Sequence, residues 1–375
     1  MGTYDVAVIG TGGVGSATVY ALAKAGAKVI GLDRFDPPHD RGSSHGDTRV
    51  VRKAYFEHPD YVPLLQQAYR GWQHLEEAAG KQLYFPTGVL QIGPSEGEII
   101  SGIRNSAQEH GLAIESYTFD ELGQVFPGIK PPENTVGILE RDAGYLLVSE
   151  CIAAYLRLAK ELGAELRTNT PALDWHAREG EYLLETAGGV IQAKQLIICG
   201  GPWALQLLDD LEVPMRILQK HLYWYDNTAP EYTADGSFPV FLMETPGGLY
   251  YGFPQIDAQG VKVSRHDGGM PIEHAGWHAQ MEDAADRADV ESFLSACLPE
   301  LSHTVNRQAA CLYTMTPDQH FLLGPHPRRQ GLHYVAGLSG HGFKFASALG
   351  EILCDLTVKG KTSAPIGFLR ATRFY

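Results

Sequence analysis

Gly10-Thr11-Gly12-Gly13-Val14-Gly15 is the stretch of this sequence that decides its fold. It follows residues 4–9, a β-branched apolar run typical of a strand, and it opens residues 16–25, whose pattern is helical. The spacing is G-x-G-x-x-G, in which the glycines permit a tight turn, a close approach of pyrophosphate and close packing of the helix on the strand. Backbone N–H groups and the helix dipole at such a turn favour phosphate. The stretch therefore predicts a dinucleotide-binding site.

The residues after this turn complete a β-α-β unit. Gly26 ends the helix, residues 28–32 form a second strand, and Asp33 follows, where a carboxylate accepts hydrogen bonds from ribose hydroxyls. A glycine motif alone is a weak signal, but strand, turn, helix and acid in register predict a Rossmann-type domain. FAD and NAD share this fingerprint, so the motif by itself leaves the choice of dinucleotide open.

The composition is that of an ordinary globular protein. The 375 residues suffice for two substantial cores, and 44% are hydrophobic and 20% charged. The net charge of −14 argues against non-specific binding to nucleic acid or acidic membranes. No run approaches the roughly 18 apolar residues needed to span a bilayer. The five cysteines are scattered and lack a CxxC pair, which fits a reducing compartment, so we expect a cytoplasmic protein.

The rest of the chain alternates between α/β and strand-rich patterns. Helices are expected over residues 61–80, 96–110, 152–162 and 283–297, and a strand, a glycine turn and a helix over residues 333–357. We expect a mixed α/β and α+β fold, in which a discontinuous Rossmann-type cofactor domain holds a second, mainly antiparallel-sheet substrate domain. The expected boundaries are residues 1–82, 147–218 and 318–375 for the cofactor domain and residues 83–146 and 219–317 for the substrate domain.

Two groups of basic residues are candidates for a functional site. Alternation along a strand places Lys262 and His266 on one face. His45, Arg49 and Arg52 would share one face of a helical turn. On spacing alone, each group is more typical of a solvated basic surface than of a functional site, so their assignment depends on the motifs around them.

Four further segments, taken together with the glycine turn, carry a resemblance to a known family. They are Pro37-Pro38-His39 with Ser43-Ser44-His45-Gly46-Asp47-Thr48-Arg49, Tyr250-Tyr251-Gly252-Phe253-Pro254, Cys311-Leu312-Tyr313-Thr314, and Gly337-Leu338-Ser339-Gly340-His341-Gly342-Phe343-Lys344. From the first strand to the last helix, the chain resembles the monomeric sarcosine oxidase and N-methyltryptophan oxidase family. This resemblance implies covalent FAD and oxidation of secondary N-methyl amino acids by O₂, which yields hydrogen peroxide and an imine that hydrolyses.

The resemblance also implies roles for individual residues. Cys311 would carry FAD through a thioether to the 8α-methyl carbon, and Lys262 would activate O₂ through its charge. His266 would contact the substrate, while Arg52 and Lys344 would bind the substrate carboxylate. A cation is unfavourable at the start of a helix, so an anion paired with Lys344 is the better explanation there. The other residues assigned to the flavin ring and substrate are His45, Arg49, Tyr251 and Tyr313, and those assigned to the cofactor are Gly10, Gly12, Gly13, Val14, Gly15, Asp33, Arg34, Ser43, Ala172, Gly340, His341 and Gly342, with Arg49 and Lys344 again.

The identity of the substrate is the property of this protein that the sequence determines least. Leu242 and Met243, before the Tyr-Tyr-Gly-Phe-Pro segment, are apolar and resemble a sarcosine-type pocket wall. Sarcosine is the first expected substrate, giving an amino acid, formaldehyde and hydrogen peroxide, with N-methyltryptophan or pipecolate as the alternative. An NAD-dependent dehydrogenase and a non-catalytic flavoprotein also remain open. We expect a monomer without a metal site and without nucleic-acid or membrane partners.

Overall fold

The strand that leads into the glycine turn lies in the middle of the first sheet. The computed structural model describes residues 3–235, 238–277 and 283–375. The first sheet consists of β1 (Thr3–Ile9), β2 (Val29–Leu32), β9 (Glu165–Arg167), β10 (Asp174–Arg178), β11 (Glu181–Thr186), β12 (Gly189–Ile198), β19 (Leu322–Pro325) and β20 (Leu332–Ala336). β1 pairs in parallel with β2 on one side and with β12 on the other. The glycine turn thus leaves the carboxyl end of a central parallel strand, where ligands of such sheets bind.

The first helix begins inside the glycine stretch, at Gly13 and not at residue 16 as the sequence pattern predicts. A Cβ on Gly15 would lie 1.8 Å from the carbonyl oxygen of Gly10. A Cβ on Gly10, whose φ is +86°, would lie 2.4 Å from the carbonyl oxygen of Cys199 at the end of β12. The helix can therefore start this close to the sheet only because these two positions carry no side chain.

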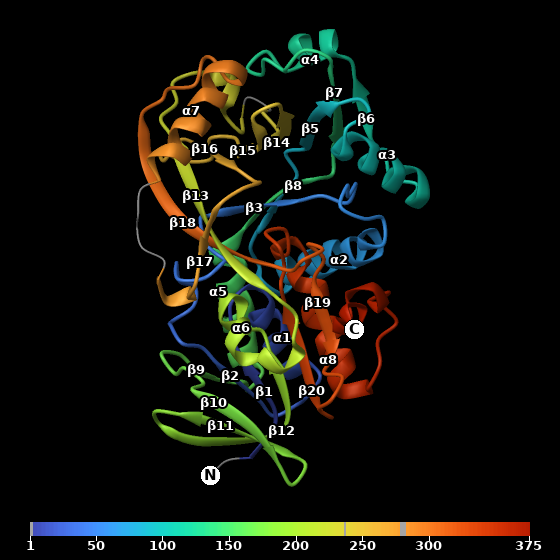
Figure 1. Cartoon of the computed structure of the whole chain (residues 1–375), viewed down its shortest axis with the longest axis vertical. Coiled ribbons are helices and arrows are strands. Elements are labelled where there is room, and N and C mark those ends of the chain that lie inside the picture. Colours follow the sequence, from blue (N-terminus) through green and yellow to red (C-terminus); the bar gives the residue numbers. More distant parts are fainter. Residues whose placement is uncertain (1–2, 236–237, 278–282) are drawn as a thin grey trace.

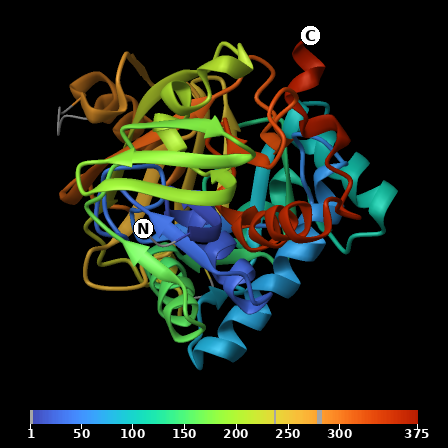
Figure 2. The ribbon, with the colours of Figure 1, turned by 90° about the horizontal axis from the view of Figure 1, so that it is seen from below.

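Helices cover both faces of the first sheet. The helices of the described residues are α1 (Gly13–Lys24), α2 (Tyr61–Ala79), α3 (Glu98–His110), α4 (Phe119–Val125), α5 (Val148–Glu161), α6 (Ala204–Leu207), α7 (Ala284–Cys297) and α8 (Ala346–Lys359). On one face, α1, α2, α5 and α8 share an apolar core with Val6 and Val8 of β1. On the other face, Ala7 and Ile9 pack against residues of α6 and of the C-terminal turn. Figure 2 views this half from below, with β10 to β12 in front and α8 beside α1.

A second sheet forms the other half of the molecule (Figure 1). Its strands are β5 (Val89–Pro94), β6 (Glu115–Tyr117), β7 (Thr135–Glu140), β13 (Arg216–Tyr225), β14 (Val240–Thr245), β15 (Gly248–Phe253), β16 (Val261–Arg265), β17 (Met270–Ile272) and β18 (Val305–Met315). All neighbouring strands are antiparallel except β5 and β14, which are parallel. Phe293 and Leu294 of α7 pack on one face, against Phe241 and Tyr250. The mixed fold class is thereby confirmed.

A small third sheet lies between the two large ones (Figure 1) and corrects one sequence-based prediction. It consists of β3 (Thr48–Val51), β4 (Tyr84–Phe85) and β8 (Gly144–Leu147). His45, Arg49 and Arg52 do not share a helical turn, because Arg49 lies within a strand and Arg52 follows its end. The β-branched pair Val50-Val51 favours this extended conformation, and β3 pairs with β8 along its whole length.

The other expected elements agree with the structure. The helices expected over residues 61–80, 96–110, 152–162 and 283–297 correspond to α2, α3, α5 and α7. The division into two domains remains a prediction, and β13 begins at Arg216, just before the boundary expected between residues 218 and 219. Within the described ranges, no helix is both long and apolar enough to cross a lipid bilayer.

We predict that Gly15→Ala destabilises the protein by about 3 kcal/mol or more, because the new methyl group would overlap the Gly10 carbonyl oxygen and push α1 away from β1. Gly123→Ala in α4 is the matched control. A Cβ at Gly123 meets no atom within 4 Å, so this substitution should raise stability by roughly 0.5–1 kcal/mol. Urea unfolding of both variants measures the difference, and equal stability of the two would contradict the close approach described above.

Candidate active site

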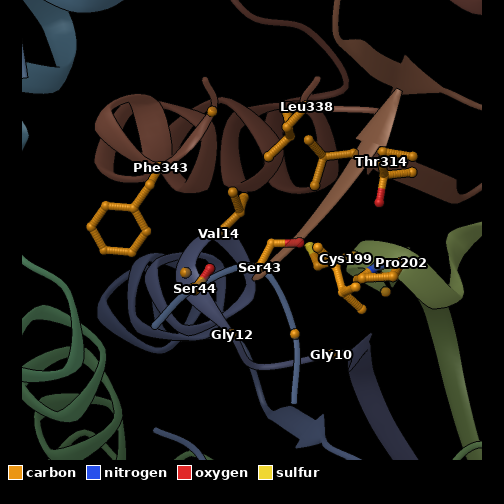
Figure 3. Close-up of a pocket in the computed structure, with 18 of the residues that line it drawn as sticks. Gly10, Gly12, Val14, Ser43, Ser44, Cys199, Pro202, Thr314, Leu338 and Phe343 are labelled. Carbon is orange, nitrogen blue, oxygen red and sulfur yellow. The ribbon is translucent and has the colours of Figure 1, made fainter. Parts of the chain in front are cut away.

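A cavity of about 310 Å³ extends from the glycine turn to the face of the second sheet. Its wall comes from segments far apart in the chain: the turn before α1, the segment between β2 and β3, the end of β12, and the turn that precedes α8. Figure 3 shows these segments surrounding the glycine-turn end of the cavity, where the labelled residues are Gly10, Gly12, Val14, Ser43, Ser44, Cys199, Pro202, Thr314, Leu338 and Phe343.

The glycine-turn end of the cavity fits a dinucleotide. A Cβ on Gly12 would meet no atom within 4 Å, so the backbone of the turn is open to a close-lying phosphate. The Asp33 carboxylate accepts hydrogen bonds from Thr11 N (2.7 Å) and Phe35 N (3.0 Å) and also lines the cavity. These bonds fix the carboxylate and leave it lone pairs for ribose hydroxyls. Beyond it, the guanidinium of Arg34 lies 5.7 Å from the centre of a Trp203 ring.

Cys311, on β18, lies in a positively charged and almost completely buried environment. Its side chain is 1% exposed, and its Sγ accepts a hydrogen bond from Arg49 Nη2 at 3.3 Å. Arg49 Nη2 also donates to the carbonyl oxygen of Ser43, and Nη1 to that of Thr48. Burial acts to lower the pKa of Arg49, but Cys311 and the neighbouring Tyr251 and Tyr313 raise it, so this cation is permanent.

Two further cations, Arg52 and Lys344, line the cavity close enough for the charge of Arg52 to act on Lys344. Arg52 is 4% exposed, and its Nη2 binds both carboxylate oxygens of Glu57 at 2.9 Å. Burial alone raises the pKa of Glu57, but Arg52 lowers it to about 2. Lys344 forms no ion pair with any described carboxylate, and burial together with Arg52 lowers its pKa to about 7. The wall of the cavity around Arg52 therefore holds two cations and one anion when Lys344 is protonated.

Lys344 lies in a 3₁₀ turn, Phe343–Phe345, immediately before α8, within the stretch of residues 333–357 expected to form a strand, a glycine turn and a helix. Its Nζ donates to the carbonyl oxygen of His341 at 2.8 Å. The expected pairing of Lys344 with an anion, the substrate carboxylate, remains a prediction.

Lys262 is held behind the cavity wall. Its Nζ donates to the carbonyl oxygens of Gly46 and Thr48, both at 2.8 Å, and contacts Thr48 Oγ1 at 2.6 Å. These acceptors use all three N–H groups of an ammonium. The Nζ also lies 4.0 Å from the centre of the Phe253 ring, which lines the cavity. Burial lowers the pKa of Lys262, while Asp47 acts in the opposite direction.

Two histidines, His266 in the cavity wall and His45 behind it, are neutral. Burial lowers the pKa of His266 to about 4, so its imidazole carries no charge near pH 7. Its Nδ1 lies 3.5 Å from the hydroxyl of Tyr313, and its ring packs edge-on against Tyr251. Burial, followed by the charge of Arg49, lowers the pKa of His45 to about 3.

The structure brings most of the sequence-predicted site residues to this one cavity. Those that line it are Gly10, Gly12, Gly13, Val14, Asp33, Arg34, Ser43, Arg49, Arg52, Ala172, Tyr251, His266, Tyr313, Gly340, His341, Gly342 and Lys344. Those that do not are Gly15, His45, Lys262 and Cys311, each of which is buried against a lining residue or the glycine turn. The roles assigned to all of these residues remain predictions.

Sequence analysis missed three residues next to Arg52. Glu57 binds Arg52 directly, and the rings of Tyr55 and Phe56 lie 4.3 and 4.6 Å from the guanidinium carbon. The sequence does show an acid, Glu57, five residues after Arg52, but this spacing alone does not predict an ion pair between them. Of the two expected wall residues, Leu242 lines the cavity, whereas Met243 points to the opposite face of the sheet, because neighbouring strand residues alternate.

Known proteins resemble this chain over nearly its whole length. A family described as "FAD dependent oxidoreductase" matches residues 5–356. The chain is 36% identical to monomeric sarcosine oxidase of Bacillus sp. (strain B-0618), over 99% of the chain and 96% of the relative. It is 35% identical to N-methyl-L-tryptophan oxidase of Shigella dysenteriae serotype 1 (strain Sd197), over 99% of both proteins.

Solved structures share the fold. NikD, described as an unusual amino acid oxidase essential for nikkomycin biosynthesis, superposes with a TM-score of 0.85 at 24% identity, covering 99% of this chain and 98% of NikD. L-proline dehydrogenase from P. horikoshii gives a TM-score of 0.85 at 21% identity, with coverage of 99% and 98%. With the glycine turn, Asp33 and the full-length relatives in agreement, the chain belongs to the FAD dependent oxidoreductase family.

Proposed function

We propose that this protein is an oxidase of secondary amino acids that are N-methylated or cyclic, with sarcosine as the first substrate to test. The observation that carries the proposal is the pair of buried cations, Arg52 and Lys344, that line the same cavity as the dinucleotide turn. The reaction removes two electrons from a C–N bond of the substrate. The resulting imine hydrolyses, which for sarcosine gives glycine and formaldehyde.

The charges at the substrate end favour a carboxylate. With Lys344 protonated, Arg52 and Lys344 outnumber Glu57, and Arg49 adds a further buried positive charge nearby. Burying a cation without a counter-ion raises the free energy of the folded protein, and a carboxylate that enters the cavity lowers it again by pairing with the cation. Arginine presents a planar fork to a carboxylate, and lysine adds a point charge.

The same charges act on the amine. A substrate ammonium next to Arg49 and Arg52 would be repelled, so the cavity favours the neutral amine, whose lone pair is needed for oxidation. Uncharged His266, Tyr251 and Tyr313 surround this end without adding an anion that would hold the ammonium form. We assign these three residues to substrate orientation.

The residues at the turn and at β18 would hold FAD, which when bound supplies the two-electron acceptor and returns the electrons to O₂. The permanent charge of Arg49 at 3.3 Å supports Cys311 as the covalent attachment point, because it stabilises the attacking thiolate. Lys262 would stabilise negative charge developing on O₂ through its field, since its own N–H groups are bound to the protein.

Two further points belong to the proposal. All five cysteines are free, which supports a reducing, cytoplasmic location, and the relative in Bacillus is named as monomeric, which supports a monomer. The family match argues against the NAD-dependent alternative. N-methyltryptophan and pipecolate remain the alternative substrates, because one of the full-length relatives is named an N-methyl-L-tryptophan oxidase.

A peroxide-coupled screen of sarcosine, N-methyltryptophan, pipecolate and proline tests the proposed reaction. We expect peroxide from at least one of these acids and at least a tenfold lower rate from its amide, which lacks the carboxylate that Arg52 and Lys344 bind. Glycine, a primary amine, is the control. Equal rates with acid and amide would contradict the carboxylate site, and no peroxide from any secondary amino acid would contradict the function.

We predict that Cys311→Ser releases its flavin into the supernatant on acid precipitation, whereas wild-type protein keeps yellow colour in the pellet. A serine hydroxyl is a far weaker nucleophile than the thiolate beside Arg49, so no thioether forms. Cys354→Ser, a buried cysteine of α8, is the control and should keep covalent flavin. Covalent flavin retained in Cys311→Ser would remove this residue as the attachment point.

We predict that Lys262→Met leaves the anaerobic reduction half-reaction within about threefold of wild type but slows the reaction with O₂ by about two orders of magnitude or more. Methionine has a similar length and no charge, so it tests the electrostatic role. Stopped-flow absorbance measures both half-reactions separately. Lys81→Met, at an exposed surface ion pair, is the control for loss of a positive charge. Unchanged oxygen kinetics in Lys262→Met would exclude the lysine from this step.

A further inference from the structure

We infer that Tyr55 is a positioning residue that holds both carboxylate-binding cations, Arg52 through its ring and Lys344 through its hydroxyl. The inference rests on the proposed function, because it concerns how that carboxylate site is held together. Tyr55 is 0% exposed, lies between the end of β3 and α2, and does not line the cavity itself.

The ring of Tyr55 contacts Arg52. The guanidinium carbon lies 4.3 Å from the centre of the Tyr55 ring and 4.6 Å from that of Phe56. Both distances are within the range of a cation–π interaction, which is strongest where water is excluded. Arg52 Nη1 also donates to the carbonyl oxygen of Ala54, next to Tyr55. The orientation of the guanidinium fork therefore depends on this segment and not on Glu57 alone.

The hydroxyl of Tyr55 connects Lys344 to His341. Lys344 Nζ lies 3.4 Å from Tyr55 Oη, which in turn lies 2.6 Å from His341 Nδ1. His341 Nε2 lies 3.1 Å from the carbonyl oxygen of Gln319, which can only accept, so Nε2 carries the hydrogen. Burial lowers the pKa of His341 to about 3, so the ring is neutral and Nδ1 is an acceptor.

These assignments give the hydrogen bonds one direction. Lys344 donates to the Tyr55 oxygen, the Tyr55 O–H donates to His341 Nδ1, and His341 Nε2–H donates to Gln319. An oxygen whose own hydrogen is donated is a stronger acceptor, so His341 makes Tyr55 a better partner for the ammonium. The chain opposes the effect of burial, which lowers the pKa of Lys344. The charged and titratable groups around Lys344 are Arg49, Arg52, Tyr55, Glu57, His266 and His341.

Tyr55→Phe tests the inference, since it keeps the ring over Arg52 and removes the hydroxyl. Acetate is the probe, a carboxylate without an amine, and its Kd is measured by the change in flavin absorbance. We expect the Kd for acetate, and KM for the substrate found in the screen, to rise roughly tenfold, with kcat changing less than threefold. Because acetate needs the ammonium of Lys344, its Kd rises as pH rises through the pKa of Lys344, and this midpoint should move to lower pH in Tyr55→Phe.

Two further variants make the result specific. Tyr61→Phe removes another buried hydroxyl, which accepts from Phe321 N and lies 3.3 Å from His320, so it should lower the melting temperature without changing the Kd for acetate. In a Lys344→Met background, Tyr55→Phe should have no further effect on that Kd, because the hydroxyl acts through Lys344.

An unchanged Kd and pH midpoint in Tyr55→Phe, or an effect that persists in Lys344→Met, would overturn the inference while leaving the proposed function intact. Wild-type protein that binds no acetate would instead contradict the carboxylate site itself, and the inference with it.

Discussion

The first turn of α1 lies so close to the end of β1 that no side chain fits between them, and the rest of the structure depends on this contact. Gly15 faces the carbonyl oxygen of Gly10, and Gly10 faces that of Cys199 at the end of β12. The contact fixes the start of the helix at the carboxyl end of two parallel strands. It thereby places backbone N–H groups of the turn in the cavity wall, where phosphate is favoured.

The second constraint is electrostatic. Arg49, Arg52, Lys262 and Lys344 are all largely or wholly buried around one cavity, in a chain with a net charge of −14. Backbone carbonyls, aromatic faces and the carboxylate of Glu57 hold these cations. Such an arrangement is unfavourable for stability unless an anion enters or a lysine loses its proton. This cost is consistent with a site that binds a carboxylate and handles developing negative charge.

The two large sheets contribute differently to this site. The first sheet and its helices supply backbone N–H groups at turns. These groups would bind the dinucleotide through their position, whatever side chains the turn carries. The second sheet supplies side chains from one face, among them Leu242, Tyr251 and Phe253, which alternate with the core residues of the other face. The short third sheet places Arg49 between them, so both halves meet at the residue that contacts Cys311.

The sequence alone determined the local features. The glycine spacing predicted the turn and its ligand, and periodicity predicted α2, α3, α5 and α7 within a few residues, because both are properties of neighbours along the chain. The motifs around the basic residues also indicated which of them belong to the functional site. Spacing failed at His45, Arg49 and Arg52, since pairing of β3 with β8 overrides a helical interpretation. Only the tertiary structure decided the contacts of Arg49 with Cys311, 262 residues away, and of Tyr55 with His341, 286 residues away. Such contacts arise from the packing of distant segments, which no local pattern records.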